Sequence, residues 1–271
     1  EVIKVEPPGG DVARQFEFIT PEGVSGYFMQ QNCGKKDLCL DLAFPEAKEI
    51  VLKLVEVCDV VVENFRPGVM ARLGLSYQEL LKLNPSLIMC SISAFGQRSP
   101  YANRPAGDMV IQSMSGIASL TGEPDGAPQT TGMSLSDTTG GLHAFGAISS
   151  GLYRRAITGC GQYIDVALMD CVLWQNEWAS QYLFLSQGKA TPTRYGNRRP
   201  ILIPGNLFRG KDGWIAIVAS TDPGWRNLTQ AMDLPELGED ARFSTRASRI
   251  ANRDELENII DEWVVSFDSV T

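Results

Sequence analysis

Residues 132–155 read GMSLSDTTGGLHAFGAISSGLYRR. Bulky and small residues recur in this stretch at helical spacing, which predicts an amphipathic helix that reaches Arg154 and Arg155. The bulky positions are Leu142, Phe145, Ile148 and Leu152, and the small positions are Gly141, Ala144, Ala147 and Gly151. The small stripe allows another backbone, or a ligand, to come close to the helix.

Asp137 is the carboxylate of this stretch, and we expect it at or just before the helix N-terminus. Unpaired backbone N–H groups there favour an anion, so we expect the side chain to be ionised at neutral pH. An aspartate in such a place is commonly an N-cap, which stabilises a helix by about 1 kcal/mol. The alternative is a reactive carboxylate, because Gly140 and Gly141 place no side chain in the way of a reactant.

The composition is that of an ordinary globular protein. The chain has 271 residues, of which 44% are hydrophobic and 21% charged, enough for one large domain or two smaller ones. The formal net charge of −8 argues against a general nucleic-acid binder, which needs a basic field. A small anionic ligand needs only a local basic cluster, and the composition is compatible with one.

Cysteine and histidine usage narrows the chemistry further. The six cysteines form no Cys-x-x-Cys pair, and His143 is the only histidine. A zinc site or a Cys-His dyad would need paired cysteines or further histidines, so we predict no metal site. The cysteines are interpreted as buried free thiols of a reducing compartment. Without a signal peptide or a run of about 18 apolar residues, the predicted location is the cytoplasm, away from membranes.

The first half of the chain alternates between strand and helix patterns. We predict strands at 1–6, 38–42, 58–63 (of buried type) and 86–93, helices from Pro45, at 67–73 and after Ser76, and an irregular loop up to Gln31. This order is typical of a parallel α/β sheet, in which ligands lie beyond the carboxyl ends of the strands. The loops expected at that edge are 7–10, 64–68 and 95–104.

The second half predicts a smaller domain after a linker. A helix at 108–120, a loop at 121–131, a strand at 163–168 and a helix at 169–187 complete the large part, with Trp174 and Trp178 interpreted as paired core aromatics. A hairpin of 207–209 with 213–219, a helix from Pro223 and a helix at 253–266 follow. We therefore predict a large α/β domain at 1–187, a linker at 188–205 and a small α+β domain at 206–271.

Several segments, taken in order, resemble the family III CoA-transferases, the CaiB/BaiF family that includes formyl-CoA transferase. The matching pieces are EVIKVEPPGGD at 1–11, NCGKK at 32–36, LDL at 40–42, DVVVENFRPG at 59–68, GQYIDVA at 161–167, and GNR at 196–198 through KDGWIAI at 211–217. Each piece is weak, but the ordered set is specific and spans essentially the whole chain. The resemblance implies a Rossmann-like parallel-sheet domain with a smaller α+β domain, in an interlocked homodimer.

The resemblance also implies a transferase chemistry centred on Asp137. In the family, an aspartate at this position attacks the thioester of an acyl-CoA, and a mixed anhydride and then an aspartyl-CoA thioester form before a carboxylic acid accepts the CoA. Backbone N–H groups near Gly140 and Gly141 are candidates to stabilise the oxyanions. CoA and acyl-CoA are then substrates, and no tightly bound cofactor or histidine base is needed.

The CoA-contacting residues implied by the resemblance lie in two loops and a short helix. They are Leu40, Asp41, Leu42, Ala43, Asn64, Phe65, Arg66 and Arg72, with the two arginines as partners for phosphates. The family's first strand and helix, and its C-terminal return segment, are expected to lie outside residues 1–271. The glycine-run loop of formyl-CoA transferases is not visible at 196–215, which argues against formate and oxalate as substrates.

Two other functions are compatible with these residues. A racemase of the same superfamily would need a histidine before Asp108, but Gly107 stands there, and we interpret His143 as a packing residue. A non-catalytic CoA-binding subunit of a heteromeric transferase is the second alternative, and the retention of Asp137 with its two glycines argues against it.

Overall fold

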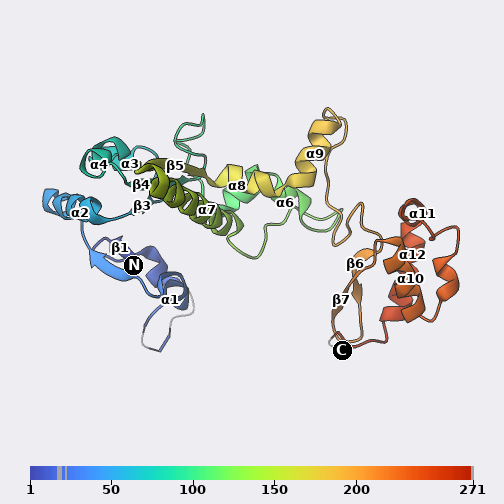
Figure 1. Cartoon of the computed structure of the whole chain (residues 1–271). Coiled ribbons are helices and arrows are strands. Elements are labelled where there is room, and N and C mark those ends of the chain that lie inside the picture. Colours follow the sequence, from blue (N-terminus) through green and yellow to red (C-terminus); the bar gives the residue numbers. More distant parts are fainter. Residues whose placement is uncertain (17–19, 22, 270–271) are drawn as a thin grey trace. The chain divides into compact units, whose positions relative to one another are not determined.

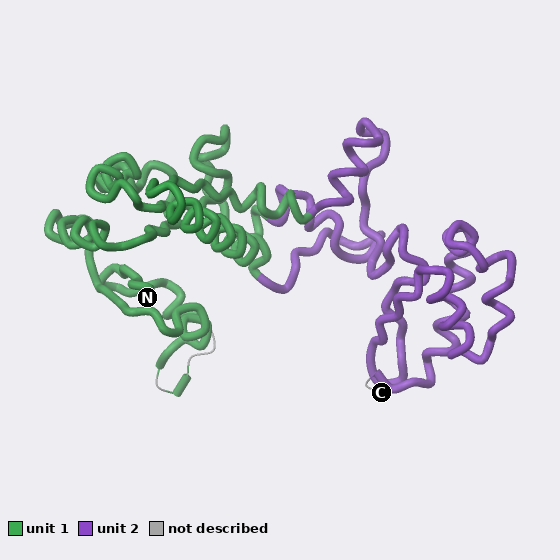
Figure 2. The backbone as a smooth tube through the Cα atoms, viewed as in Figure 1, with its two compact units in different colours: residues 1–111, 134–175 green, residues 112–133, 176–271 purple. Residues whose placement is uncertain are grey.

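The computed structural model describes residues 1–16, 20–21 and 23–269 (Figure 1). The chain divides into two compact units (Figure 2). Unit 1 contains residues 1–111 and 134–175, and unit 2 contains residues 112–133 and 176–271. The boundaries of the predicted domains stay a prediction. In the described part of the chain, no helix combines the length and apolar character needed to cross a membrane.

Unit 1 contains the parallel strands that the sequence predicts. Strands β3 (Val60–Glu63), β4 (Ile88–Ser93) and β5 (Gln162–Ala167) form a parallel sheet in the order β3-β4-β5. Strands β1 (Ile3–Glu6) and β2 (Lys36–Cys39) form a second, two-stranded parallel sheet. The mixed α/β class with parallel strands is thus confirmed, but these strands belong to two sheets.

Helices cover both faces of the three-stranded sheet (Figure 1). Successive side chains of a strand point to opposite faces, so Ile88 and Cys90 pack with helix α7 (Leu135–Thr158) and Met89 packs on the other face. Helices α2 (Pro45–Val57) and α4 (Tyr77–Leu83) contribute Val55 and Leu80 to that second core. The central strand β4 is therefore buried, whereas β3 at the edge of the sheet is only partly covered.

Local sequence signals explain where several of these helices begin and end. Pro45 stands in the first turn of α2, and the Ser76 hydroxyl accepts the N–H of Glu79 at the start of α4. Gly68, with φ 83°, precedes the short helix α3 (Val69–Arg72). Gly159, with φ 71°, ends α7 in the left-handed conformation that glycine adopts without strain.

Several predicted boundaries are wrong for identifiable reasons. The predicted loop before Gln31 contains a short helix, η1 (Val12–Gln15), and α1 (Gly26–Asn32), which the Ser25 hydroxyl caps. The predicted helix 108–120 is divided into α5 (Asp108–Met114) and α6 (Ile117–Leu120) by Gly116 in the left-handed region. Strand β2 begins two residues and ends three residues earlier than predicted. The strand predicted as buried at 58–63 is mostly not buried, because Glu63 is the only buried residue of β3.

The predicted helix at 169–187 is likewise two helices, α8 (Leu168–Gln175) and α9 (Glu177–Leu185). Asn176 separates them, and its side-chain amide donates to the carbonyl of Ser115 at 2.8 Å. Trp174 is 78% exposed, so its interpretation as a core residue is wrong.

Unit 2 includes the hairpin and helices predicted near the C-terminus. Strands β6 (Gly205–Arg209) and β7 (Trp214–Val218) pair antiparallel, and α10 (Asp222–Ala231) and α12 (Arg253–Val264) follow. The sequence did not indicate η2 (Pro235–Gly238) or α11 (Arg246–Ala251). Arg249 of α11 is fully buried beside the core, where its guanidinium donates to the carbonyls of Ile203, Phe243 and Ser220 and to the Asp222 carboxylate.

Candidate functional site

Asp137 lies in the first turn of α7, as its third helical residue. Asp137 thus lies at the helix N-terminus as expected, but the N-cap is Ser134, so the interpretation of Asp137 as the cap is wrong. The side chain is exposed to solvent. An acidic residue in a first turn is favoured by the helix dipole, so this position still suits a carboxylate.

A second carboxylate holds the turn that carries Asp137. Oδ1 of Asp108, the first residue of α5, accepts the backbone N–H of Ser136 at 2.7 Å and its hydroxyl at 2.8 Å. Ser136 is fully buried, so this contact fixes the backbone next to Asp137. The sequence pattern around Asp108 does not predict this role, because the contact joins two segments that lie far apart in the sequence.

The pKa of Asp137 is raised above its ordinary value of 3.8. Desolvation by the surrounding protein is the larger cause, although the side chain keeps an exposed surface, and repulsion from the Asp108 carboxylate adds to it. A carboxylate that has lost part of its hydration is a stronger nucleophile once it is ionised. The site therefore holds a carboxylate that is accessible to solvent and partly desolvated.

Gly140 and Gly141 do not offer free donors in this helix. They are its sixth and seventh residues, where backbone N–H groups bond to carbonyls one turn earlier. A Cβ on Gly140 would lie 2.2 Å from Cδ2 of Leu168. A Cβ on Gly141 would have open space around it, with no described atom other than the backbone of its own helix within 4 Å. The oxyanion role expected for N–H groups near these glycines stays a prediction. Of the two glycines, only Gly141 would give an added side chain open space.

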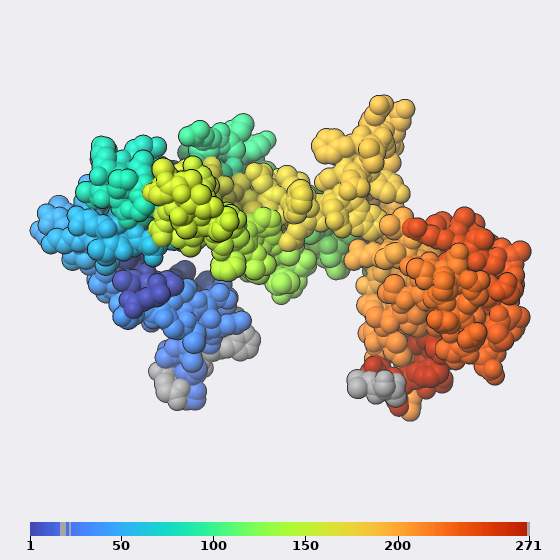
Figure 3. Space-filling model, viewed as in Figure 1, coloured from blue at the N-terminus to red at the C-terminus, as the bar shows by residue number. Residues whose placement is uncertain are grey.

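Most of the small stripe of α7 packs on the sheet, but the bulky stripe is divided, because Ile148 and Leu152 pack against the same core. On the small stripe, a Cβ on Gly151 would lie 3.3 Å from Cδ1 of Ile88. Leu142 and Phe145 are 66% and 72% exposed. The segment that contains α7 is the yellow-green part of the surface in Figure 3. Close approach at the small stripe therefore serves the sheet.

The cysteines and the histidine contribute little to this site. All six cysteines are free, but only Cys90 and Cys171 are buried, so the prediction of buried thiols is wrong for the exposed ones: Cys33, Cys39 and Cys160. Burial raises the pKa of Cys90 to about 11, which makes its thiol unreactive. Nδ1 of His143 lies 2.9 Å from the carbonyl of Thr139, within its own helix.

The first predicted CoA loop, 40–43, follows β2. The N–H of Leu40 donates to the carbonyl of Glu6, and the carboxylate of Asp41 accepts the N–H of Ala43 at 2.9 Å. Asp41 thus stabilises a turn, which leaves the partly exposed side chains of Leu40 and Leu42 as the surfaces for a ligand.

The second predicted CoA loop follows β3. Nδ2 of Asn64 donates to the carbonyl of Ile92 at 2.8 Å, and Phe65 is 44% exposed. Arg66 and Arg72 are exposed, and neither has an ion-pair partner among the described residues. In the same part of the chain, the two loops share no hydrogen bond with each other or with Asp137.

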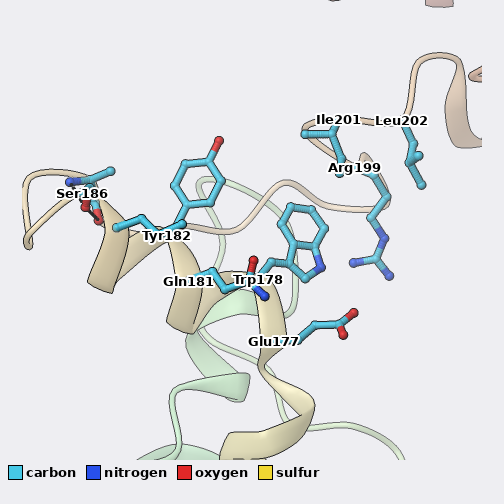
Figure 4. A pocket seen from close by; sticks show the side chains of 10 residues that line it. Glu177, Trp178, Gln181, Tyr182, Ser186, Arg199, Ile201 and Leu202 are labelled. Carbon is cyan, nitrogen blue, oxygen red and sulfur yellow. Dashed lines mark hydrogen bonds between the residues drawn. The ribbon is translucent and has the colours of Figure 1, made fainter.

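A separate cavity of about 840 Å³ belongs to unit 2 (Figure 4). It lies between α9 and the segment 199–202, and Trp178, Tyr182 and Leu202 line it. Trp178, predicted to be a core residue, is partly exposed there. Asp137 and the predicted CoA-contacting residues do not line this cavity.

Comparison with protein families gives a match over nearly the whole chain. Residues 1–269 match the family described as CoA-transferase family III. An acetyl-CoA:oxalate CoA-transferase from Acetobacter aceti is 41% identical over 96% of this chain and 67% of its own length. A succinyl-CoA:mesaconate CoA-transferase from Haloarcula hispanica is 38% identical over 100% of this chain and 69% of its own length.

A solved structure of a CAIB/BAIF family protein from Brucella suis is similar in fold as well as in sequence. It superposes with a TM-score of 0.85 at 39% identity, over 99% of this chain and 71% of that protein. This chain thus spans about two thirds of the length of the relatives it matches.

Proposed function

The chain belongs to CoA-transferase family III, and we propose that it moves CoA from an acyl-CoA thioester to a carboxylic acid through a covalent intermediate on Asp137. The observation that carries this proposal is the exposed Asp137 carboxylate, held at the start of α7 by the Asp108–Ser136 contact.

The first half of the proposed reaction loads CoA onto the enzyme. A carboxylate oxygen of Asp137 attacks the thioester carbonyl carbon, and the C–S bond breaks to release CoA thiolate and leave a mixed anhydride. The thiolate then attacks the Asp137 carbonyl carbon of the anhydride. The donor leaves as its carboxylate, and Asp137 carries CoA as a thioester.

The second half repeats these steps with the acceptor. Its carboxylate attacks the aspartyl thioester, CoA thiolate leaves, and a new anhydride joins the acceptor to Asp137. Attack of the thiolate on the acceptor's carbonyl carbon gives the new acyl-CoA and regenerates the aspartate. No proton is gained or lost over the cycle, so the reaction needs no histidine base.

The acyl-CoA is expected to contact the two loops at the strand ends. The exposed arginines Arg66 and Arg72, which have no ion-pair partner in the described part of the chain, are proposed to pair with its phosphates. Leu40, Leu42 and Phe65 offer apolar surface for the adenine end. The missing glycine-run loop argues against oxalate, but the names of the curated relatives include oxalate as well as mesaconate, so small dicarboxylic acids, oxalate among them, are the first acceptors to test.

An interlocked homodimer is part of this proposal. Exposed apolar residues on α7 support it, because a helix surface of this kind is commonly covered by another chain. They are Leu142, Phe145, Tyr153 and Ile157, each more than 60% exposed. Light scattering after gel filtration tests it, and a monomer at all concentrations would contradict it. The cytoplasmic location stays a prediction.

Trapping the intermediate tests the chemistry. Incubation with an acyl-CoA and hydroxylamine should convert Asp137 to a hydroxamate, found by mass spectrometry of the peptide that contains it. Deuterium from solvent entering the α-carbon would indicate a racemase instead. Retention of CoA without a hydroxamate or transfer would indicate a binding subunit.

A further inference from the structure

We propose that Glu63 is a positioning residue for the loop 64–66, an inference that rests on the proposed role of this loop in binding acyl-CoA. Glu63 is the last residue of β3, and it is 9% exposed. Its Oε2 accepts the backbone N–H of Phe65 at 2.7 Å. A buried carboxylate therefore holds the backbone between Asn64 and Arg66.

The contact belongs to a polar row across the sheet. Glu63, Ser91 and Asp165 are register neighbours on β3, β4 and β5. The two oxygens of Asp165 lie 2.9 and 3.2 Å from the backbone nitrogen of Gln97, which donates to them. Each outer carboxylate of the row thus holds a loop N–H at the carboxyl edge, where parallel sheets bind ligands.

Burial of the Glu63 carboxylate lowers the stability of the fold, which indicates that this residue has a role other than stabilisation. In the described part of the chain, Glu63 has no cationic partner within 4 Å, so no ion pair offsets its burial. Burial raises the pKa of Glu63, and the Asp165 charge adds to this rise, while Ser91 and the Phe65 N–H oppose it. An apolar side chain of similar size would fill the space without that cost.

The held backbone aims the exposed residues of the loop. The Asn64 amide fixes the loop on Ile92, and the N–H of Val69 donates to the carbonyl of Arg66 at 3.1 Å. With the Phe65 N–H fixed as well, each residue of 64–66 has a main-chain or side-chain anchor. The Phe65 ring and the Arg66 guanidinium are left for the ligand.

The test compares Glu63→Met, Glu63→Gln and Arg66→Ala in the purified protein. Methionine removes the acceptor at similar volume, glutamine keeps an acceptor oxygen without the charge, and Arg66→Ala removes a proposed phosphate contact. The readouts are the Kd for CoA from calorimetry, hydrogen exchange of the 64–68 backbone, and the midpoint of chemical denaturation.

We expect Glu63→Met to raise the Kd about tenfold, or about 1.4 kcal/mol, with faster exchange at Phe65 and an unchanged or higher midpoint. Glu63→Gln should bind CoA within about twofold of the unsubstituted protein and keep its protection, because the amide oxygen can still accept the N–H of Phe65. Arg66→Ala should weaken binding and leave the exchange rates unchanged.

Each other outcome has a defined meaning. Weaker binding in Arg66→Ala but not in Glu63→Met overturns the positioning role and leaves the CoA loop in place. Equal weakening by methionine and glutamine, with protection at Phe65 intact, also overturns it. If the unsubstituted protein forms the hydroxamate but all three variants bind CoA with unchanged Kd, then both the assignment of the CoA loop and this inference are overturned. Absence of the hydroxamate from the unsubstituted protein overturns the proposed function.

Discussion

Asp108 and Ser136 meet across 28 residues of sequence, and their contact sets the start of α7. A single oxygen of Asp108 accepts both the N–H and the hydroxyl of Ser136. Ser134 makes no side-chain cap bond, and the carboxylate of Asp108, from another helix, accepts one of the first-turn N–H groups, that of Ser136. The same carboxylate raises the pKa of Asp137 through repulsion.

We expect Asp108→Asn to move the acid limb of the pH–rate profile to lower pH. The amide keeps an oxygen for Ser136 but carries no charge, so one of the two causes that raise the pKa of Asp137 is removed. Ionised Asp137 then persists to lower pH. The measurement is kcat/KM against pH. Asp108→Ala is the control, because it also removes the acceptor and should lower the free energy of unfolding by about 1 kcal/mol. An acid limb that does not move in the asparagine variant contradicts this account.

Asp137→Ala should abolish CoA transfer and leave the affinity for CoA within a few-fold. The carboxylate is the proposed covalent carrier, and alanine cannot form the anhydride or the thioester. Transfer is measured with an acyl-CoA and a panel of dicarboxylic acids, and CoA binding by calorimetry. Full activity in this variant would refute the assignment.

Gly161→Ala should strongly destabilise the protein, by about 3 kcal/mol or more. A Cβ at this position would lie 2.1 Å from the backbone oxygen of Leu87, which cannot move without disturbing β4. Gly141→Ala is the matched control, because its Cβ meets open space on an exposed helix. It should be neutral or stabilising by up to about 1 kcal/mol, since alanine favours helix more than glycine. Chemical denaturation compares both, and equal stabilities would show that the β4–β5 junction is looser than described.

Glu6→Gln should lower the free energy of unfolding at neutral pH, and the difference from the unsubstituted protein should disappear in acid. The hydrogen bond from Arg14 is the largest cause that lowers the pKa of Glu6 below its ordinary value of 4.5, against the opposing effect of burial. The folded state therefore favours the ionised form. That stabilisation is complete above pH 4.5 and is lost as the pH falls through the lower, folded-state pKa. Denaturation of both proteins along a pH series measures it, and a difference that is constant with pH would contradict the ionic explanation.

Local patterns predicted much of the fold. The proline at the start of α2, the Ser76 cap of α4, and the turn between β6 and β7 each depend on neighbouring residues, and each is found where expected. The parallel strands were also predictable, because their hydrophobic runs alternate with helix patterns. Helix breaks at Gly116 and Asn176 were missed, since the apolar spacing continues across them.

The sequence by itself determined the family, the alternation of strands and helices, and Asp137 as the candidate reactive group. Only the tertiary structure decided which residues of α7 pack on the sheet. Ala144, Gly151 and part of the bulky stripe do so, and Ile88 leaves little room for a side chain at Gly151. It also decided that Asp108 holds the start of α7 and that Glu63 holds the loop after β3. Such contacts depend on packing between distant segments, and the residue types at those positions do not specify their partners.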